Sequence, residues 1–321
     1  MNFKHLALGA ASALALGFGA SAALAANTST VTQPGDHNEA TVTQTGGAQG
    51  TSTITQSGTN ISTAKGLASV TQAGSAINTS TLDQLAGSLR ARATVDQSGS
   101  DAGTSEITQG GTAAVAAVTQ VSEAGNLNYA SIWQGNNDGA QDQNAEVSQT
   151  GAGNGVAIVQ AQVLSRVGVD ASVIQVGNTN SAYVYQGGDA NLATIERTGN
   201  NSSDEVRQMG ANNIATSLRT GSGDTISVEQ YSNGNISNVT GSGSNNTITL
   251  AQALSDGNSS DIDQDGNDNT IFLTQSALLA ASTSVIAQAG NYNLATVTQS
   301  VVGGTSTITQ AGDHNTATVR Q

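Results

Sequence analysis

A short unit recurs from residue 31 onward: an apolar residue, any residue, glutamine, and then a turn rich in glycine and asparagine. Residues 33–44 (QPGDHNEATVTQ) and residues 310–321 (QAGDHNTATVRQ) are identical at nine of twelve positions. We count about 25 such units, most often 11 residues apart and next most often 12. A unit this short cannot bury an apolar face by itself, so neighbouring units have to stack.

Each unit is predicted to form one strand followed by one turn. In the segment ATVTQ, the side chains of Ala40, Val42 and Gln44 share one face and the two threonines share the other, because a strand has a period of two. The Gly-x-x-Asn segments are predicted to supply the positive-φ residues of tight turns. These turn residues are Gly35, Asn38, Gly177, Asn180, Gly188, Asn191, Gly290, Asn293, Gly312 and Asn315.

Stacking explains why glutamine recurs in each unit. Two units make one flat coil of about 22 residues, and about twelve coils at about 4.8 Å per strand give an all-β solenoid or cross-β stack about 60 Å long. An inward amide costs a few kcal/mol if it is buried without a partner, but in a stack it can donate to one neighbour and accept from the other. The predicted ladder residues are Gln33, Gln44, Gln56, Gln72, Gln175, Gln186, Gln264, Gln275, Gln288, Gln299, Gln310 and Gln321.

The repeat has irregularities of two kinds. The position expected to hold glutamine holds another residue at Arg197, Thr220 and Gly241. Longer gaps, which predict loops, follow Gln56, Gln120, Gln134 and Gln160.

Residues 1–25 are typical of a secretory signal peptide. A short basic start precedes an apolar run of about fifteen residues, and Ala23-Leu24-Ala25 fits the small-x-small cleavage rule. Residues 26–321 are then the mature repeat domain, which contains no 18-residue apolar run and so no predicted transmembrane helix. The chain has no cysteine, so disulfides cannot stabilise the exported protein.

Composition and charge exclude several classes of protein. Hydrophobic residues make up 36% of the chain, aromatic residues 3% and charged residues 10%, which argues against the thick core of a globular enzyme. A net charge of −14 argues against a nucleic-acid partner. The sequence has no Gly-x-Ser-x-Gly, phosphate loop or His-x-x-x-His. We therefore expect no catalytic residue, cofactor or metal.

The pattern Gln-x-Gly-x-x-Asn-x-Ala-x-x-x-Gln resembles the curlin repeat of bacterial curli fibre subunits. Residues 33–44, 175–186, 288–299 and 310–321 match it at every defined position, and residues 186–197 match it except at the last. Weaker repeats extend the resemblance over nearly all of residues 26–321.

The resemblance implies a secreted functional amyloid. Such subunits cross the periplasm and leave unfolded through a dedicated outer-membrane pore, with accessory chaperones. At the bacterial cell surface they polymerise into extracellular fibres for adhesion and biofilm matrix, and a minor subunit nucleates the major one. The implied partners are copies of this chain, a related nucleator or major subunit, the pore and the chaperones.

The sequence also points to where copies would join. An open solenoid has two bare strand edges, and here the first and last units are near-copies without a distinct cap. Head-to-tail contacts that do not close grow into filaments. The predicted polymerisation edges contain Val31 and Val42 at one end and Ile308 and Val319 at the other.

Other functions remain as alternatives at this point. The chain could be the minor nucleator, or a monomeric β-solenoid adhesin. An ice-binding solenoid is disfavoured, because outward positions that hold threonine near both ends hold Tyr183, Tyr185, Glu196 and Arg207 in the middle.

Two surface features have ordinary explanations. The acidic group from Asp256 to Asp268 lacks the Gly-Gly-x-Gly-x-Asp calcium repeat, so we expect it to be solvated. Trp133, Tyr183 and Tyr185 alternate with inward residues and are predicted to face outward.

Overall fold

The computed structural model describes residues 27–45, 50–58, 65–74, 77–86, 88–99, 102–123, 126–135, 142–161, 168–277, 279–300 and 302–321. The predicted signal peptide, residues 1–25, lies outside the described residues. So do the central parts of the four longer gaps, those after Gln56, Gln120, Gln134 and Gln160.

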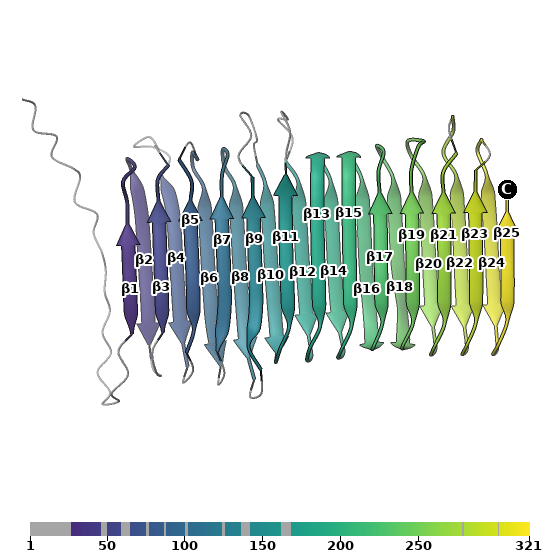
Figure 1. Cartoon of the computed structure of the whole chain (residues 1–321), viewed down its shortest axis with the longest axis horizontal. Coiled ribbons are helices and arrows are strands. Elements are labelled where there is room, and N and C mark those ends of the chain that lie inside the picture. Colours follow the sequence, from purple (N-terminus) through teal and green to yellow (C-terminus); the bar gives the residue numbers. More distant parts are fainter. Residues whose placement is uncertain are drawn as a thin grey trace, which may run out of the picture.

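The described chain forms 25 strands and no helix, arranged as two parallel sheets that face each other (Figure 1). Successive strands alternate between the sheets. Each strand therefore pairs, within its own sheet, with the strands two before and two after it in the chain. The predicted all-β solenoid is confirmed.

The thirteen-strand sheet contains the odd-numbered strands. Its strands are β1 (Thr28–Thr32), β3 (Thr51–Gln56), β5 (Thr79–Gln84), β7 (Gly103–Gln109), β9 (Asn128–Gln134), β11 (Gly155–Ala161), β13 (Ser181–Asp189), β15 (Ser203–Ala211), β17 (Thr225–Gln230), β19 (Thr247–Gln252), β21 (Thr270–Gln275), β23 (Leu294–Gln299) and β25 (Thr316–Arg320).

The twelve-strand sheet contains the even-numbered strands. Its strands are β2 (Asn38–Thr45), β4 (Gly66–Ala73), β6 (Arg92–Gly99), β8 (Val115–Ser122), β10 (Asn144–Gly151), β12 (Asp170–Val176), β14 (Leu192–Thr198), β16 (Ile214–Ser222), β18 (Ile236–Ser244), β20 (Ser259–Asp265), β22 (Thr283–Ala289) and β24 (Thr305–Ala311).

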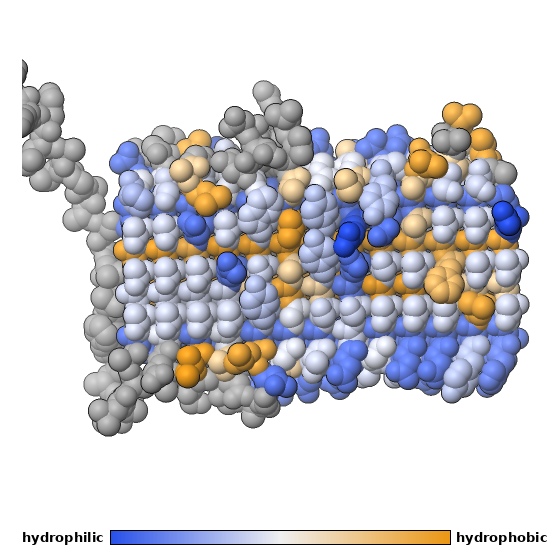
Figure 2. Space-filling view, in the orientation of Figure 1, coloured by the Kyte–Doolittle hydropathy of each residue, from blue (hydrophilic) through white to orange (hydrophobic). Residues whose placement is uncertain are grey.

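The core is a thin layer between the sheets, filled by the inward branched side chains. Val184, for example, lies in register with Val206 one coil further on, and both are fully buried. Burial alternates along nearly every strand, as a half-buried pleated strand requires. Figure 2 looks onto the outer face of the thirteen-strand sheet, where side chains of like hydropathy align in rows along the stack.

Candidate functional site

Glutamine amides form an unbroken ladder inside the thirteen-strand sheet. Each Nε2 donates to the Oε1 of the glutamine one coil further on, at distances from 2.6 Å at the Gln33–Gln56 step to 3.3 Å at the Gln299–Gln321 step. The ladder runs through Gln33, Gln56, Gln84, Gln109, Gln134, Gln160, Gln186, Gln208, Gln230, Gln252, Gln275, Gln299 and Gln321. Most members also donate to a backbone carbonyl, as Gln186 does to Asp170 at 2.8 Å.

The ladder of the twelve-strand sheet is interrupted. One segment runs from Gln44 through Gln72, Gln97, Gln120 and Gln149 to Gln175, and another from Gln264 through Gln288 to Gln310. Between them the register aligns Arg197, Arg219 and Gly241 with the glutamines.

The assignment of Thr220 to the glutamine position was therefore wrong. Arg219 is in register with Arg197 and is buried, whereas Thr220 is exposed. The physical reason is alternation: the ladder residue stands two positions before the turn glycine, Gly221, and the residue directly before the glycine points outward.

Four charged side chains fill the interruption. The Arg197 guanidinium forms a bidentate pair with Asp204, with Nη2 2.7 Å from Oδ1 and Nε 2.9 Å from Oδ2. Its Nη1 donates to Asp224 at 3.1 Å, and Nη2 of Arg219 lies 3.9 Å from the other Asp224 oxygen. All four side chains are at most 1% exposed. We call Arg197, Asp204, Arg219 and Asp224 the buried charge cluster.

Neighbouring groups accommodate the cluster only in part. Ser217 donates to Asp204 at 3.2 Å, and Nη1 of Arg219 donates to the carbonyl oxygens of Thr240 and Gln264. Gly241 leaves room for this reach, because a Cβ there would lie 2.3 Å from Nη1 of Arg219.

At the two edges of the interruption the ladder groups lose their partners. Nε2 of Gln175 and Oε1 of Gln264 are buried without a hydrogen bond, and so are Nε and Nη2 of Arg219. These are the two glutamines that face the break, one with its donor and the other with its acceptor.

Burial shifts the ionisation of this cluster. Desolvation raises the pKa of Asp204, and the attraction of Arg197 offsets part of that rise. Desolvation also lowers the pKa of Arg219, against the attraction of Asp224.

The sequence reasoning missed both aspartates. Asp204 is in register with Ala182 and Ile226, which are inward positions, and Asp224 stands where Asn246 stands one coil later. The signal was present, because the 22-residue spacing from Ala182 already assigns Asp204 to the inward face.

The turn asparagines stack in their own ladder. Oδ1 of Asn154 accepts the backbone N–H of Asn180 at 3.0 Å, and Oδ1 of Asn269 accepts that of Asn293 at 2.9 Å. Nδ2 of Asn293 donates to the carbonyl of Gly312 at 2.8 Å. Asn191 makes the same two kinds of bond in the turns on the other side of the stack.

The predicted reason for these asparagines was wrong. Gly177, Gly188, Gly290 and Gly312 do have positive φ, but the second positive-φ residue is the one before the asparagine, such as Thr179 at 60°. None of the predicted turn asparagines has positive φ, and neither does Gly35. The asparagine is needed because its buried amide links consecutive turns.

Stacking also explains the turn glycine. A Cβ on Gly177 would lie 1.9 Å from the carbonyl oxygen of Gly199 in the next coil. The turns therefore pack as closely as the strands do.

The four terminal strands hold the predicted edge residues. Val31 on β1 and Val319 on β25 are only partly buried, whereas Val42 on β2 and Ile308 on β24 are 2% and 4% exposed. The outermost strands β1 and β25 each have a neighbour on one side only. Within the described residues, their other sides are therefore unpaired parallel edges.

A comparison with protein families gives two matches. The model of the curlin-associated repeat matches residues 25–58 and 170–199. The chain carries curlin-associated repeats. No curated protein matches the chain.

The two matched repeat segments have different ladders. Residues 25–58 contain the first members of both ladders, Gln33 and Gln44. Residues 170–199 contain Gln175 and Arg197, so the second segment already enters the interruption. The second matched segment thus includes a charged residue at a ladder position.

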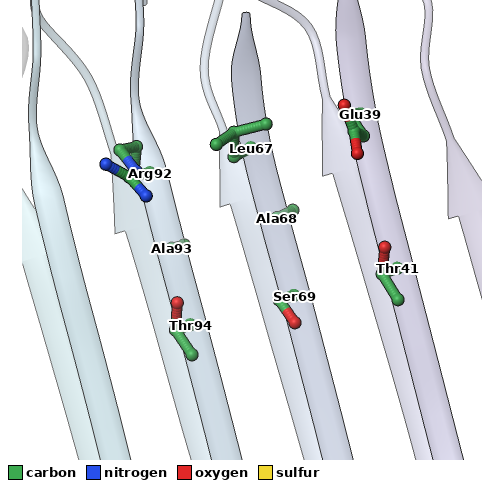
Figure 3. Close-up of a pocket in the computed structure, with 8 residues that line it drawn as sticks. All are labelled: Glu39, Thr41, Leu67, Ala68, Ser69, Arg92, Ala93 and Thr94. Carbon is green, nitrogen blue, oxygen red and sulfur yellow. The ribbon is translucent and has the colours of Figure 1, made fainter.

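One surface feature of the described residues lies on the twelve-strand sheet. A surface pocket of about 190 Å³ crosses β2, β4 and β6, where Glu39 and Arg92 lie on either side of Leu67 (Figure 3). It is also lined by Thr41, Ala68, Ser69, Ala93 and Thr94. These short side chains include no nucleophile with an adjacent base.

Other surface residues lie as the alternation indicates. Trp133 is 42% exposed, Tyr183 and Tyr185 are half-buried on the same outer face, and Asp261 and Asp263 are exposed. Within the described ranges, no group of three or more His, Cys, Asp or Glu is arranged to hold a metal ion. The described residues also contain no helix of the length and hydropathy needed to span a membrane.

Proposed function

We propose that this chain is a secreted structural subunit of curli-like amyloid fibres. Copies add head to tail through the strands at the two ends of the stack, and the fibres serve adhesion and biofilm matrix. Residues 26–321 act as one repeat domain after removal of residues 1–25 during export. The chain is a fibre-forming subunit and has no catalytic role.

One observation carries the proposal: both ends of the described stack are unpaired parallel strand edges with ladder residues in place. Such edges recruit further strands unless they are capped. Every inter-coil amide bond of the ladders points the same way, from the lower-numbered glutamine to the higher. One end therefore presents amide donors where the other presents amide acceptors.

The curlin-associated repeats support the same conclusion. Their implied partners are a related nucleator, an outer-membrane pore and accessory chaperones, and their implied location is the bacterial cell surface. An exported chain without cysteine gains its order from stacking rather than from cross-links.

Assembly of residues 26–321 tests the proposal. The chain is purified in denaturant and diluted, and thioflavin fluorescence and pelletable mass are followed before fibre diffraction. We expect fibres with reflections near 4.7 and 10 Å and a lag that preformed seeds abolish.

Two other results would change the assignment. Seedable growth without spontaneous assembly would indicate a subunit that requires a nucleator. A β-rich monomer that stays soluble for days would contradict the fibre proposal and favour a monomeric solenoid adhesin.

A further inference from the structure

The two sheets have unequal numbers of strands, and this limits how copies can join. In the described stack both outermost strands, β1 and β25, belong to the thirteen-strand sheet. Figure 1 shows the even-numbered strands in the intervals between the odd-numbered ones, so the thirteen-strand sheet extends beyond the other at both ends. The inward side chains of these outermost strands are accordingly less buried than those of β2 and β24.

A copy added in the same orientation leaves a gap. In this unrotated junction β25 pairs with β1 of the next copy and completes the thirteen-strand sheet. The other sheet then has an empty strand position between β24 and the next copy's β2, which are about 9.6 Å apart at about 4.8 Å per strand. Two backbone edges, one on β24 and one on the next copy's β2, and the facing apolar side chains would lack partners at every junction.

A copy rotated by half a turn about the stack axis leaves no gap in either sheet. Within the chain, each strand is related to the following one by such a half turn and half a coil of rise, because successive strands alternate between sheets. Continuing that operation after β25 puts β1 of the next copy on β24 and its β2 on β25. The rotation reverses strand direction and exchanges sheets together, so all pairs remain parallel.

We propose that consecutive copies in the fibre are related by this half turn, so that the thirteen-strand sheet of one copy continues as the twelve-strand sheet of the next. We call the arrangement the half-turn junction. It rests on the proposed function, because it specifies how the fibre subunits meet.

The terminal sequences suit the half-turn junction. Residues 305–310 (TSTITQ) on β24 meet residues 28–33 (TSTVTQ) of β1, which differ only in Ile308 and Val31. Residues 316–321 (TATVRQ) of β25 meet residues 39–44 (EATVTQ) of β2, and the inward alanine, valine and glutamine are the same in both. Inward positions are therefore matched in size and polarity on both sheets.

The turns match only in this arrangement. The turn of residues 311–315 (AGDHN) follows β24, and the turn of residues 34–38 (PGDHN) follows β1, so stacking β1 on β24 also stacks these two turns. His314 and His37 have similar positive φ angles, 59° and 53°. The His314 ring already stacks on Tyr292 with centroids 4.9 Å apart, and His37 of the next copy continues that row. In the unrotated junction the two turns lie on opposite sides of the stack.

Both amide ladders continue through the half-turn junction. Gln310, which ends the interrupted ladder, meets Gln33, which begins the unbroken ladder of the next copy. Gln321 meets Gln44 in the same way. Along either sheet of the filament, the unbroken ladder of one copy would therefore be followed by the interrupted ladder of the next.

Engineered cysteine pairs distinguish the two junctions, because the chain has no cysteine of its own. Thr30, Thr307 and Thr318 are exposed on the outward faces of the terminal strands. Thr30 is adjacent to Thr307 in the half-turn junction and to Thr318 in the unrotated one. Adjacent Cα atoms about 4.8 Å apart can be bridged by a disulfide, whereas the other pair lies on opposite faces of the stack.

The experiment oxidises fibres grown from T30C/T307C and from T30C/T318C and separates the denatured products by size. We expect covalent dimers and longer covalent oligomers from T30C/T307C and only monomers from T30C/T318C. T41C/T318C is a second half-turn pair, on the other sheet, and is expected to behave like the first. The four single-cysteine variants, T30C, T41C, T307C and T318C, measure lateral cross-linking, which is subtracted.

Covalent oligomers from T30C/T318C would overturn the half-turn junction while leaving the fibre proposal intact. Seedable fibres in which no pair cross-links would overturn it as well. Failure of the parent chain to form fibres would instead contradict the proposed function. The two failures are therefore distinguishable.

Discussion

At the residue scale, the buried charge cluster is the feature least expected in a repeat of this kind. Two arginines and two aspartates are buried between the sheets, where a charge is stable only when it is paired. The arrangement is balanced in charge but leaves two Arg219 nitrogens and two ladder groups without hydrogen bonds. Its members are therefore interdependent.

Removing one charge should destabilise the chain far more than removing all four. Asp204→Ala removes both acceptor oxygens of the bidentate pair from the Arg197 guanidinium and is expected to cost about 3–5 kcal/mol. The fourfold variant carries the residue types of adjacent coils and is expected to be neutral or more stable by about 1–4 kcal/mol. It combines Arg197→Gln, Asp204→Ala, Arg219→Gln and Asp224→Asn.

Urea unfolding of freshly diluted soluble chain would measure both variants. A fourfold variant as unstable as Asp204→Ala would show that the cluster contributes net stability that the ladder residues cannot replace.

The raised pKa of Asp204 predicts a pH dependence. The folded chain keeps this proton at a pH where the unfolded chain, with an ordinary aspartate pKa of about 3.9, has lost it. Binding of this proton by Asp204 therefore stabilises the folded chain. This stabilisation is complete below the ordinary pKa of aspartate and is lost as the pH rises through the raised pKa of Asp204. Wild type should lose stability relative to Arg197→Gln/Asp204→Ala as the pH rises above about 4.

Urea midpoints of the two proteins across this pH range would check the sign. A difference that grows in favour of wild type as the pH rises would mean that the attraction of Arg197 exceeds the cost of burial.

At the element scale, each strand outside the interruption supplies one ladder amide, at its end or directly after it, and the cost of losing that amide depends on its place in the ladder. Gln208 accepts from Gln186 and donates to Gln230, each at 2.9 Å. Gln175 accepts from Gln149 at 3.3 Å, but its own Nε2 has no partner. Both side chains are fully buried, which makes them a matched pair.

Gln208→Leu is expected to cost more stability than Gln175→Leu, by about 1–3 kcal/mol. Gln208→Leu leaves Oε1 of Gln230 buried without its donor. Gln175→Leu leaves no ladder oxygen without a donor, because Nε2 of Gln175 donates to none. Equal changes in the urea midpoint would show that the amide bonds between coils contribute little beyond side-chain packing.

The end strands allow a test of edge addition that does not depend on the junction geometry. Val319 on β25 points inward but is only partly buried, and it becomes fully buried when another copy adds. Val319→Lys would then place an unpaired ammonium inside the junction. We expect seeded elongation to stop, whereas Thr318→Lys, outward on the same strand, should elongate normally.

Thioflavin fluorescence after addition of wild-type seeds measures this directly. Normal growth of the Val319→Lys variant would place the contact between copies somewhere other than the terminal strands.

At the scale of the whole molecule, charge opposes assembly. The chain carries a net charge of −14, and acids such as Glu106, Glu146 and Glu196 are exposed on the strand faces. Like charges repel approaching copies, and salt shortens the range of that repulsion to about 10 Å at 0.1 M. Added salt, or a pH low enough to protonate carboxylates, should shorten the assembly lag.

The lag time across a salt series at pH 7, and across pH at fixed salt, provides the measurement. A lag that does not change in either series would remove electrostatic repulsion from the account.

The sequence by itself determined the strand-and-turn unit, the inward row of branched side chains and the glutamine ladder. These follow from local chemistry, because alternation along a strand decides which side chains face inward and 11-residue spacing returns the same residue to the same place. The same reasoning applied to the Ala182 spacing would also have assigned Asp204 to the interior.

Only the tertiary structure decided how the coils align with one another. It replaced Thr220 with Arg219 in the ladder, brought Arg197 onto Asp204 and Asp224, and gave the turn asparagines a bonding role between coils in place of a conformational one. It also placed both outermost strands in the same sheet. These outcomes depend on contacts between different strands, within a coil as for Arg197 and Asp204 or between coils as for Arg197 and Asp224. A local pattern of apolar and polar residues does not specify which partners meet across the stack.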